Sequence, residues 1–562
     1  MTYKHSFVAS SLLLWTQLTF SQTPGFTRAD TLRGMWSPER SCYEVTFCHL
    51  DVKIDPAQQS IAGSNKMAFE VVTDFDKLQI DLFQNMNVEK IVLDGKTNLT
   101  FTREYNAVFI AFPKPLIKGK RHAIQIFYNG KPQAAKRPPW DGGFTWAQDV
   151  AGNPWVVVTC QGTGASLWWP NKDHQADEPD SMMISIAVPK GLQNISNGRL
   201  RRVKELPGGW TRYDWFVSYP INNYNVTVNI GKFGHFSDVY NDGDGKLTLD
   251  YYVLPENLEK AKEQFKVVKT MFDAFQKYFG PYPFKRDGYK LIECPHNGME
   301  HQSAVAYGNR YLGGYVGRGT SEVGMKFDFI IVHETAHEWW GNSVSSKDIA
   351  DMWIHESFGA YAEALFVEHV YGDKEALSYI NGKKQNVRNE RPIIGVYNVH
   401  RSGSGDMYDK GQLVLNTLRS AINNDALWFD IVKSIAEKFK YQTINAEDVF
   451  NLINQKTGQD YSYFFDQYLK GTTIPALEVF LTKTGANLTA RYRWKSEAQD
   501  FKMPVKVTVA ENDYQFIHPT TSWQTMPLAL ARPENFKLAD ELFYVDLKLN
   551  WSYIDPRLDR TP

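Results

Sequence analysis

Two histidines four positions apart, with a glutamate beside the first, form the segment of this sequence best suited to chemistry. The segment reads His333-Glu334-Thr335-Ala336-His337. On a helix, residues four apart lie on one face with Cβ atoms about 5–6 Å apart, so both imidazoles can bind one metal ion. Glu334 can then reach a water on that metal from the side. Taken alone, the motif is also compatible with two histidines packed in a buried helix.

A third metal ligand is expected from an acidic residue on a following helix, which leaves one coordination position open. Glu356 begins such a stretch, because residues 356–365 have a helical pattern. Two helices joined by a loop can bring Glu356 beside the histidine pair. Imidazoles then supply most of the first shell, which favours zinc over magnesium or calcium. The sequence therefore predicts one Zn²⁺ per chain, bound by His333, His337 and Glu356.

Such a centre is suited to hydrolysis of an amide bond. Zinc lowers the pKa of a bound water to about 7, and Glu334 as general base can take the remaining proton and pass it to the leaving amine. Further groups must stabilise the oxyanion and specify which amide is cut. A structural zinc site has no need of a base, so the intact Glu334 favours an enzyme.

Four motifs in this order resemble those of the gluzincin aminopeptidases, a family that includes alanyl aminopeptidase and leukotriene hydrolase. They are Asn297-Gly298-Met299-Glu300-His301, His333-Glu334-Thr335-Ala336-His337, Trp353-Ile354-His355-Glu356 and Met407-Tyr408-Asp409-Lys410-Gly411. The resemblance implies a multidomain α+β fold, with an N-terminal β domain, a thermolysin-like, mainly α catalytic domain and a small C-terminal β-sandwich. It implies a zinc aminopeptidase that acts on peptides with a free N-terminus.

The same resemblance assigns further site residues. Glu300 matches the acidic residue that holds the α-ammonium group of the substrate, and Gly298 and Met299 belong to the same substrate-binding loop. Gln161 resembles a second contact to the amine and the first side chain. Tyr408 matches the tyrosine whose hydroxyl donates to the tetrahedral oxyanion, a role suited to a neutral donor with a pKa near 10.

Some positions near these motifs depart from the family pattern or allow two interpretations. Asn297 and His301 stand where the loop usually begins with Gly and ends with Asn, and His355 replaces a common Asn. His355 is either an extra titrating group or, as we favour, a packed ring. Glu363 lies seven residues beyond Glu356 on the same helix face, where it either orients a ligand histidine or is a solvated carboxylate.

Two other functions remain open on the sequence alone. One is a related zinc hydrolase with a different main substrate, and the other is a non-catalytic zinc protein that binds peptides. An endopeptidase is disfavoured, because Glu300 would obstruct a continuing chain. The balance of 62 Lys and Arg against 63 Asp and Glu gives no field that would attract nucleic acid.

The elements that position the motifs follow from hydrophobic patterning. Short β-rich runs punctuated by turns extend from about residue 41 to 236, and one such run is residues 225–230. A helical pattern from Leu258 to Phe275 ends at Gly280, and helical patterns dominate up to about Leu469. Alternating patterns then return to the end of the chain. We expect domains at residues 22–240, 241–472 and 473–562.

The first 21 residues have the pattern of a secretory signal peptide. Lys4 and His5 precede an apolar stretch from Phe7 to Phe20, and cleavage is expected after Ser21. The stretch is too short to span a bilayer comfortably, and no later run of about 18 apolar residues occurs. We therefore expect a secreted or periplasmic protein without membrane insertion, with an unprocessed buried helix as the alternative.

The four cysteines carry two expectations, one about a disulfide and one about a catalytic thiol. Cys42 and Cys48 lie in a strand-like run, in which six residues cover about 20 Å, whereas bridged Cα atoms lie within roughly 7 Å. These two should therefore not bridge each other. Cys160 and Cys294 are expected to be small buried hydrophobic residues.

Overall fold

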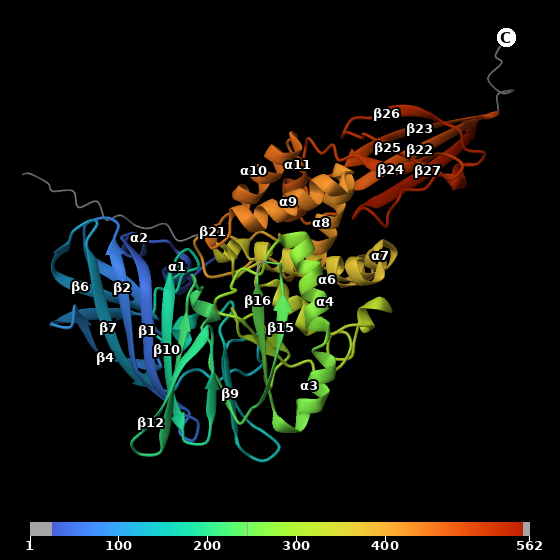
Figure 1. Cartoon of the computed structure of the whole chain (residues 1–562). Coiled ribbons are helices and arrows are strands. Elements are labelled where there is room, and N and C mark those ends of the chain that lie inside the picture. Colours follow the sequence, from blue (N-terminus) through green and yellow to red (C-terminus); the bar gives the residue numbers. More distant parts are fainter. Residues whose placement is uncertain (1–24, 244, 555–562) are drawn as a thin grey trace, which may run out of the picture.

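The computed structural model describes residues 25–243 and 245–554 of the chain. A ten-stranded sheet dominates the first part of these residues. From edge to edge, its strands are β12 (Arg199–Leu206), β13 (Trp210–Val217), β10 (Ser181–Pro189), β1 (Tyr43–Asp55), β2 (Ser60–Val71), β7 (Arg121–Gly130), β4 (Met86–Leu93), β5 (Thr97–Glu104), β6 (Ala107–Leu116) and β3 (Phe75–Asp81). The expected N-terminal β domain is thus confirmed as a β-rich region (Figure 1).

A second sheet of four strands lies in the same region of the chain. Its order is β11 (Gln193–Ile195), β14 (Asn229–Gly231), β9 (Pro154–Thr159) and β8 (Gly143–Gln148). Buried side chains of both sheets form one hydrophobic core, which also takes in Ile292, Met299 and Ala306 from the catalytic region. The substrate-binding loop predicted around Met299 is therefore packed against the β-rich region.

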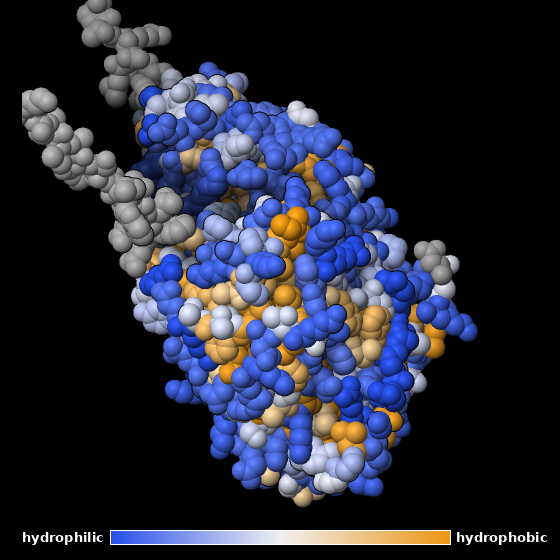
Figure 2. All heavy atoms as spheres, turned by 90° about the vertical axis from the view of Figure 1, so that its left-hand side faces the viewer, coloured by the Kyte–Doolittle hydropathy of each residue, from blue (hydrophilic) through white to orange (hydrophobic). Residues whose placement is uncertain are grey.

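On the side of the molecule drawn in Figure 2, the β-rich region exposes apolar side chains in patches. Figure 2 shows hydrophobic patches broken up by hydrophilic side chains on this side of the molecule. On three strands of the large sheet, a lysine ammonium lies over an aromatic ring. The pairs are Lys53 over Trp210 at 3.6 Å, Lys77 over Phe109 at 4.4 Å and Lys90 over Phe127 at 4.4 Å. Such contacts cover aromatic surface while keeping the charge in water.

The strand predicted at residues 225–230 is wrong for most of its length, because only Asn229–Gly231 pairs as β14. The preceding backbone is satisfied by side chains instead of by a neighbouring strand. Asn197 Oδ1 accepts from the Thr227 amide at 2.9 Å, and Ser196 Oγ donates to the Thr227 carbonyl at 2.5 Å. A buried apolar run whose backbone groups are bonded in this way does not need a sheet ladder.

The catalytic region begins with a five-stranded sheet that the sequence patterns did not reveal as a whole. Its order is β15 (Gly234–Asn241), β16 (Lys246–Val253), β17 (Tyr289–Glu293), β19 (Val305–Tyr307) and β18 (Gly298–Met299). The strands β17 to β19 are short and fully buried, so they carry no alternating pattern. Strand β18 forms one edge of this sheet.

The helix predicted from Leu258 to Phe275 is split in two. Helix α3 spans Leu258–Gln264 and α4 spans Val267–Phe279, after which Gly280 ends α4 with φ of 89°. Phe265 lies at the break and packs edge-on against Tyr307 with ring centroids 4.9 Å apart. The break therefore places a large ring between the helices and the sheet, an arrangement that the helical period alone does not specify.

Helices follow the sheet, as expected. They are α5 (Phe329–Ala336), α6 (Trp353–Tyr371), α7 (Asp373–Gly382), α8 (Asp409–Ile422), α9 (Asp425–Lys438), α10 (Ala446–Thr457) and α11 (Ser462–Phe465). Helix α6 is buried around its whole circumference from Trp353 to Val367, in contact with α4, α5, α7 and α8. A helix that is buried on every side belongs to the core of a large domain.

The C-terminal β-sandwich is also confirmed as a β fold. A four-stranded sheet has the order β26 (Gln524–Leu528), β23 (Asn487–Lys495), β22 (Ala476–Thr484) and β27 (Asp546–Ile554), and a hairpin of β24 (Val505–Ala510) and β25 (Asp513–Ile517) accompanies it. These sheets share one hydrophobic core with the helical region. Figure 1 places them at the far end of the helices from the large sheet.

The four cysteines are buried free thiols in the structure. Burial raises the pKa of the Cys48 thiol to about 12, so it stays protonated at neutral pH. The predicted leader, residues 1–21, lies outside the described residues. Within the described part of the chain, no helix has the length and apolar character needed to cross a membrane.

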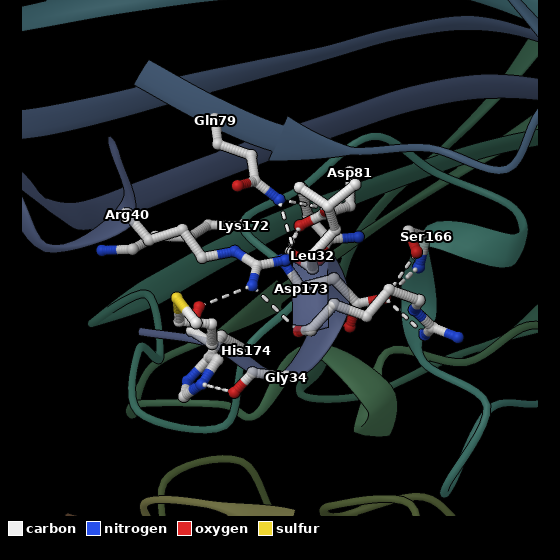
Figure 3. A network of polar contacts seen from close by, with 12 residues as sticks. Leu32, Gly34, Arg40, Gln79, Asp81, Ser166, Lys172, Asp173 and His174 are labelled. Atoms are coloured by element: carbon white, nitrogen blue, oxygen red, sulfur yellow. Dashed lines mark hydrogen bonds and ion pairs between the residues drawn. The ribbon is translucent and has the colours of Figure 1, made fainter. Parts of the chain in front are cut away.

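The segment that precedes the large sheet is fastened by a buried ion pair. Helices α1 (Arg28–Gly34) and α2 (Pro38–Ser41) lie beside β3, and Arg40 donates to Asp81 Oδ2 at 2.6 Å with both side chains fully buried (Figure 3). Gln79 donates to the other oxygen of Asp81 at 2.9 Å. A buried charge pair of this kind strongly destabilises a protein when one partner is removed.

We predict that Asp81→Asn lowers the free energy of unfolding by about 3 kcal/mol, because it leaves the Arg40 guanidinium buried without its partner. Urea unfolding followed by near-ultraviolet circular dichroism measures the change. The matched control is Glu104→Gln, since Glu104 pairs with Arg28 in an ion pair whose side chains are each 42% exposed. That substitution should change stability by less than about 1 kcal/mol. Equal effects of the two substitutions would contradict the prediction.

Candidate active site

The first histidine of the motif is positioned by the start of helix α5. The Asp328 side chain accepts from the Ile331 amide at 3.2 Å, which caps the helix. Asp328 also accepts from Tyr307 at 2.8 Å and from Gln264 at 2.7 Å, so the cap is tied to the sheet and to α3. Helix α5 ends at Ala336, and the second histidine is therefore at its C-cap.

The structure brings the three predicted metal ligands together. The Nε2 atoms of His333 and His337 lie 3.3 Å apart, and Glu356 Oε2 lies 3.8 Å and 3.4 Å from them, respectively. All three side chains are buried. Glu356 arrives from the first turn of α6, so two helices joined by a loop supply the set, as the sequence predicts.

The other ring nitrogens fix how the two imidazoles face. Nδ1 of His333 bonds to Glu363 Oε1 at 2.6 Å, and Nδ1 of His337 bonds to the carbonyl of Trp340 at 2.8 Å. Because both of these partners are acceptors, Nδ1 carries the proton in each ring and the Nε2 lone pairs face the centre. Glu363 is buried, which excludes the solvated alternative and leaves the orienting one.

The charges of the ligand set call for a cation. Among the described residues, Glu356 Oε2 is buried and has no hydrogen-bond partner. Although burial disfavours a charged ring, the Glu356 carboxylate raises the pKa of His337 to about 10. Burial likewise opposes ionisation of Glu356, yet His337 lowers its pKa to about 2. Two imidazoles and a carboxylate in this state fit a zinc ion, which would replace the proton.

Glu334 is buried, like the three predicted metal ligands, and lines one cavity together with them. Burial, together with the nearby Glu300 carboxylate, raises the pKa of Glu334 well above its usual value. A side chain at position 298 would come into collision with it, since a Cβ on Gly298 would lie 2.8 Å from Glu334 Oε1. Glycine therefore lets strand β18 approach the carboxylate closely, and substrate bound along that strand would lie within its reach.

The predicted amine contacts also meet in the structure. Gln161 Nε2 lies 2.5 Å from Glu300 Oε1 and 2.8 Å from Glu356 Oε1, and thus links the residue predicted to hold the amine to a predicted metal ligand. Tyr224 donates its hydroxyl to Glu300 Oε1 at 3.1 Å. Burial raises the pKa of Glu300 to about 7. An ammonium group placed here would favour the ionised carboxylate.

Tyr408 lies near His333, at the N-cap of α8. Its ring centroid is 6.0 Å from that of His333, and its hydroxyl interacts with Glu356. Burial raises the pKa of Tyr408 well above its usual value, so the hydroxyl remains a neutral donor. This is the state that the predicted oxyanion role requires.

The two unusual histidines are both buried. His355 Nε2 accepts from the Ser346 amide at 2.8 Å, and burial lowers the pKa of His355 to about 3. The packed, neutral ring is therefore the correct interpretation for His355. Burial also lowers the pKa of His301 to about 3, so this residue adds no charge beside Glu300.

One cavity of about 420 Å³ lies at the predicted metal ligands. The cavity contains the predicted metal ligands together with Glu334, Glu300, Gln161, Gly298, Met299 and Tyr408. Sequence reasoning missed Tyr224, Lys383 and Arg318, of which the last two line the same cavity. None of these three stands in a recognisable motif, so only the folded arrangement reveals them.

Comparisons with known proteins agree with this site. Residues 263–468 match the Peptidase family M1 domain, which contains the metal ligands. The leucyl aminopeptidase of Saccharolobus solfataricus is 24% identical over 58% of this chain and 42% of its own length. Human glutamyl aminopeptidase is 23% identical over 54% of this chain and 33% of its own length. The chain thus spans less than half the length of these two relatives.

Solved structures show the same fold. An M1 zinc metallopeptidase variant from Deinococcus radiodurans, in complex with a Tyr-Ser-Ala substrate, has a TM-score of 0.65 and 18% identity. The match covers 77% of this chain and 96% of that chain. The chain therefore carries a Peptidase family M1 domain within the fold of the M1 zinc metallopeptidases, as the gluzincin motifs predict.

We predict that Glu363→Gln lowers the affinity for zinc by about tenfold or more, because a neutral amide no longer increases the basicity of His333. The shape of the side chain is retained, so the histidine keeps a hydrogen-bond acceptor. Competition with a chromogenic zinc chelator measures the affinity. Glu375→Gln on α7 is the control and should leave the affinity unchanged. An unaltered affinity in Glu363→Gln would show that the contact does not tune the site.

Proposed function

We propose that this protein is a zinc aminopeptidase that hydrolyses the N-terminal peptide bond of peptides. The observation that carries the proposal is the bridge between the amine residue and the metal ligands. A single amide, that of Gln161, contacts both Glu300 and Glu356. Because the Glu300 carboxylate lies this close to the predicted metal ligands, one residue fits between an ammonium group bound at Glu300 and a scissile carbonyl at the metal.

The residues of the cavity divide the chemistry among them. Zinc, when bound, would polarise the scissile carbonyl and acidify the attacking water. Glu334 takes a proton from that water and delivers it to the nitrogen of the leaving amine. Tyr408 donates its hydroxyl to the oxyanion, and its raised pKa keeps that proton available.

The free amine is selected by Glu300 and the groups around it. The carboxylate is 2% exposed, so it gains a strong partner only when an ammonium group replaces water beside it. Tyr224 and Gln161 both bond to Oε1 of this carboxylate, which fixes its position for the ammonium group. An acetylated N-terminus would bring a neutral amide against a buried carboxylate, which is unfavourable.

Strand β18 supplies the backbone contacts for such a substrate. It is the edge of its sheet, and Gly298 and Met299 line the cavity. An extended peptide can add to this edge by main-chain hydrogen bonds.

The catalytic machinery includes Glu334, so a purely non-catalytic zinc protein is disfavoured.

We further propose the division of the chain and its location. Domains at residues 22–240, 241–472 and 473–562 are supported by the change from the β-rich region to the helices and back to β strands, with the first boundary at the end of β15, the first strand of the catalytic sheet. Secretion or periplasmic export is supported by the sequence of residues 1–21 alone. One zinc per chain is supported by the single group of three potential ligands within the described residues.

The function is tested by incubating the purified protein with Leu-Gly-Gly and with its N-acetylated form. We expect release of free leucine from the first peptide, no cleavage of the second, and loss of activity with a chelator. Glu334→Gln should bind zinc but lose turnover by several orders of magnitude. Cleavage inside the acetylated peptide, or no release of leucine by the zinc-loaded protein, would refute the proposal.

The role of Glu300 is tested in the same assay by Glu300→Ala. This variant should lose most of the preference for the free amine, since the partner of the ammonium group is gone. The quantity to compare is the rate of cleavage of the free peptide divided by that of the acetylated peptide. If this ratio in Glu300→Ala equals that of the wild type, another residue selects the amine.

A further inference from the structure

Among the described residues that line the active-site cavity, the Lys and Arg side chains are Arg318 and Lys383, and their segments are neighbours, since a Cβ on Gly382 would lie 2.6 Å from the Thr320 carbonyl oxygen. Glu300 is joined to the ligand set through Gln161, whose Nε2 lies 2.5 Å from Glu300 Oε1 and 2.8 Å from Glu356 Oε1. From the ligand set the contacts continue to Lys383, because His333 bonds to Glu363 and Lys383 Nζ lies 3.6 Å from Glu363. The series of contacts that starts at Glu300 and passes the predicted metal ligands therefore ends at Lys383, beside the segment that carries Arg318.

One of these two cations already has its partners. Lys383 lies between Glu363 at 3.6 Å and Asp409 at 3.7 Å, and its side chain is 12% exposed. Its charge is thus balanced by two carboxylates. Asp409 is held in addition by Asn386, which donates to it at 2.8 Å.

The other cation, Arg318, is exposed at the cavity and is unpaired. Within the described part of the chain, its guanidinium forms no ion pair and no hydrogen bond. The turn that carries it is well fixed, because Tyr315 and Arg318 exchange backbone hydrogen bonds of 2.8 and 3.0 Å. The Tyr315 ring packs edge-on against Phe329 at 5.4 Å, and its hydroxyl accepts from Asn297 at 2.6 Å.

Residues 297–300, which include strand β18, set the distance between Glu300 and the turn that carries Arg318. Asn297, which contacts the Arg318 turn through Tyr315, precedes Glu300 by three residues. Three extended residues cover about 10 Å, which is the distance between the two termini of a short extended peptide. A substrate paired with this strand and held at Glu300 therefore directs its C-terminus toward Arg318.

We propose that Arg318 binds the C-terminal carboxylate of tripeptides, so that the enzyme prefers short peptides with both termini free. This inference rests on the proposed function. A guanidinium presents a rigid fork of donors that matches a carboxylate, and here it would face one without a competing acid. The zwitterionic ends of a short peptide would then match the acidic Glu300 and the basic Arg318.

The test compares kcat/KM for Leu-Gly-Gly with that for Leu-Gly-Gly amide. We expect the wild type to prefer the free carboxylate by about three- to fivefold, the value of one exposed charged contact. In Arg318→Gln the ratio should fall to below about twofold. Arg318→Lys, which keeps the charge without the fork, should give an intermediate ratio. High salt should reduce the wild-type ratio, since the contact is solvent-accessible.

The matched control is Arg310→Gln. Arg310 is exposed on the same excursion of the chain between β19 and α5, and it does not line the cavity. This variant should keep the wild-type ratio. Titration calorimetry of both peptides into zinc-loaded Glu334→Gln, with and without Arg318→Gln, gives the same comparison for binding.

The outcomes separate the two proposals. Release of leucine from both peptides with equal kcat/KM in the wild type, or an unchanged ratio in Arg318→Gln, overturns the role of Arg318 and leaves the aminopeptidase assignment intact. No release of leucine from either peptide overturns the aminopeptidase assignment and, with it, the inference built on it. An altered ratio in Arg310→Gln would attribute the preference to the general charge of the surface and overturn the specific contact.

Discussion

A positive charge at the centre of four buried carboxylates is the constraint on which the active site depends. Glu300, Glu334, Glu356 and Glu363 are each at most 8% exposed, and all of them border the histidine pair or its immediate partners. Such a concentration of buried acid is unfavourable unless cations or protons compensate it. Lys383 compensates Glu363 in part, and a metal ion held by the two imidazoles and Glu356 would compensate the remainder.

The fold places this charge cluster where a substrate can use it. Helix α6 carries both Glu356 and Glu363 through the middle of the helical region, so a ligand and its orienting partner are fixed on one rigid element. Strand β18 packs against α5, and Gly298 makes its close approach to Glu334 possible. The β-rich region contributes Gln161 and Tyr224, which complete the amine end. Three segments far apart in the sequence thus meet around one cavity.

The metal ligands could be predicted from the sequence, because helical spacing determines which side chains share a face. His333, His337 and the pair Glu356 and Glu363 all follow that rule. Gln161 and Tyr408 needed the resemblance to a family, since a lone amide or phenol has no local signature. Tyr224 could not be foreseen, because its contact with Glu300 depends on the packing of the β-rich region.

The errors in the secondary-structure prediction have a similar origin. Residues 225–228 have the composition of a strand, but Asn197 and Ser196 satisfy the backbone that a partner strand would otherwise pair. Helix α3 ends early because Phe265 is accommodated against Tyr307. In both places a tertiary contact overrides the local pattern.

Metal analysis of crystals by anomalous diffraction at the zinc edge tests the central claim most directly. We expect one peak, between the Nε2 atoms of His333 and His337 and Oε2 of Glu356, which disappears in crystals of His337→Ala. Zinc-loaded crystals of the wild type without a peak at this position, or with the metal bound elsewhere, would contradict it.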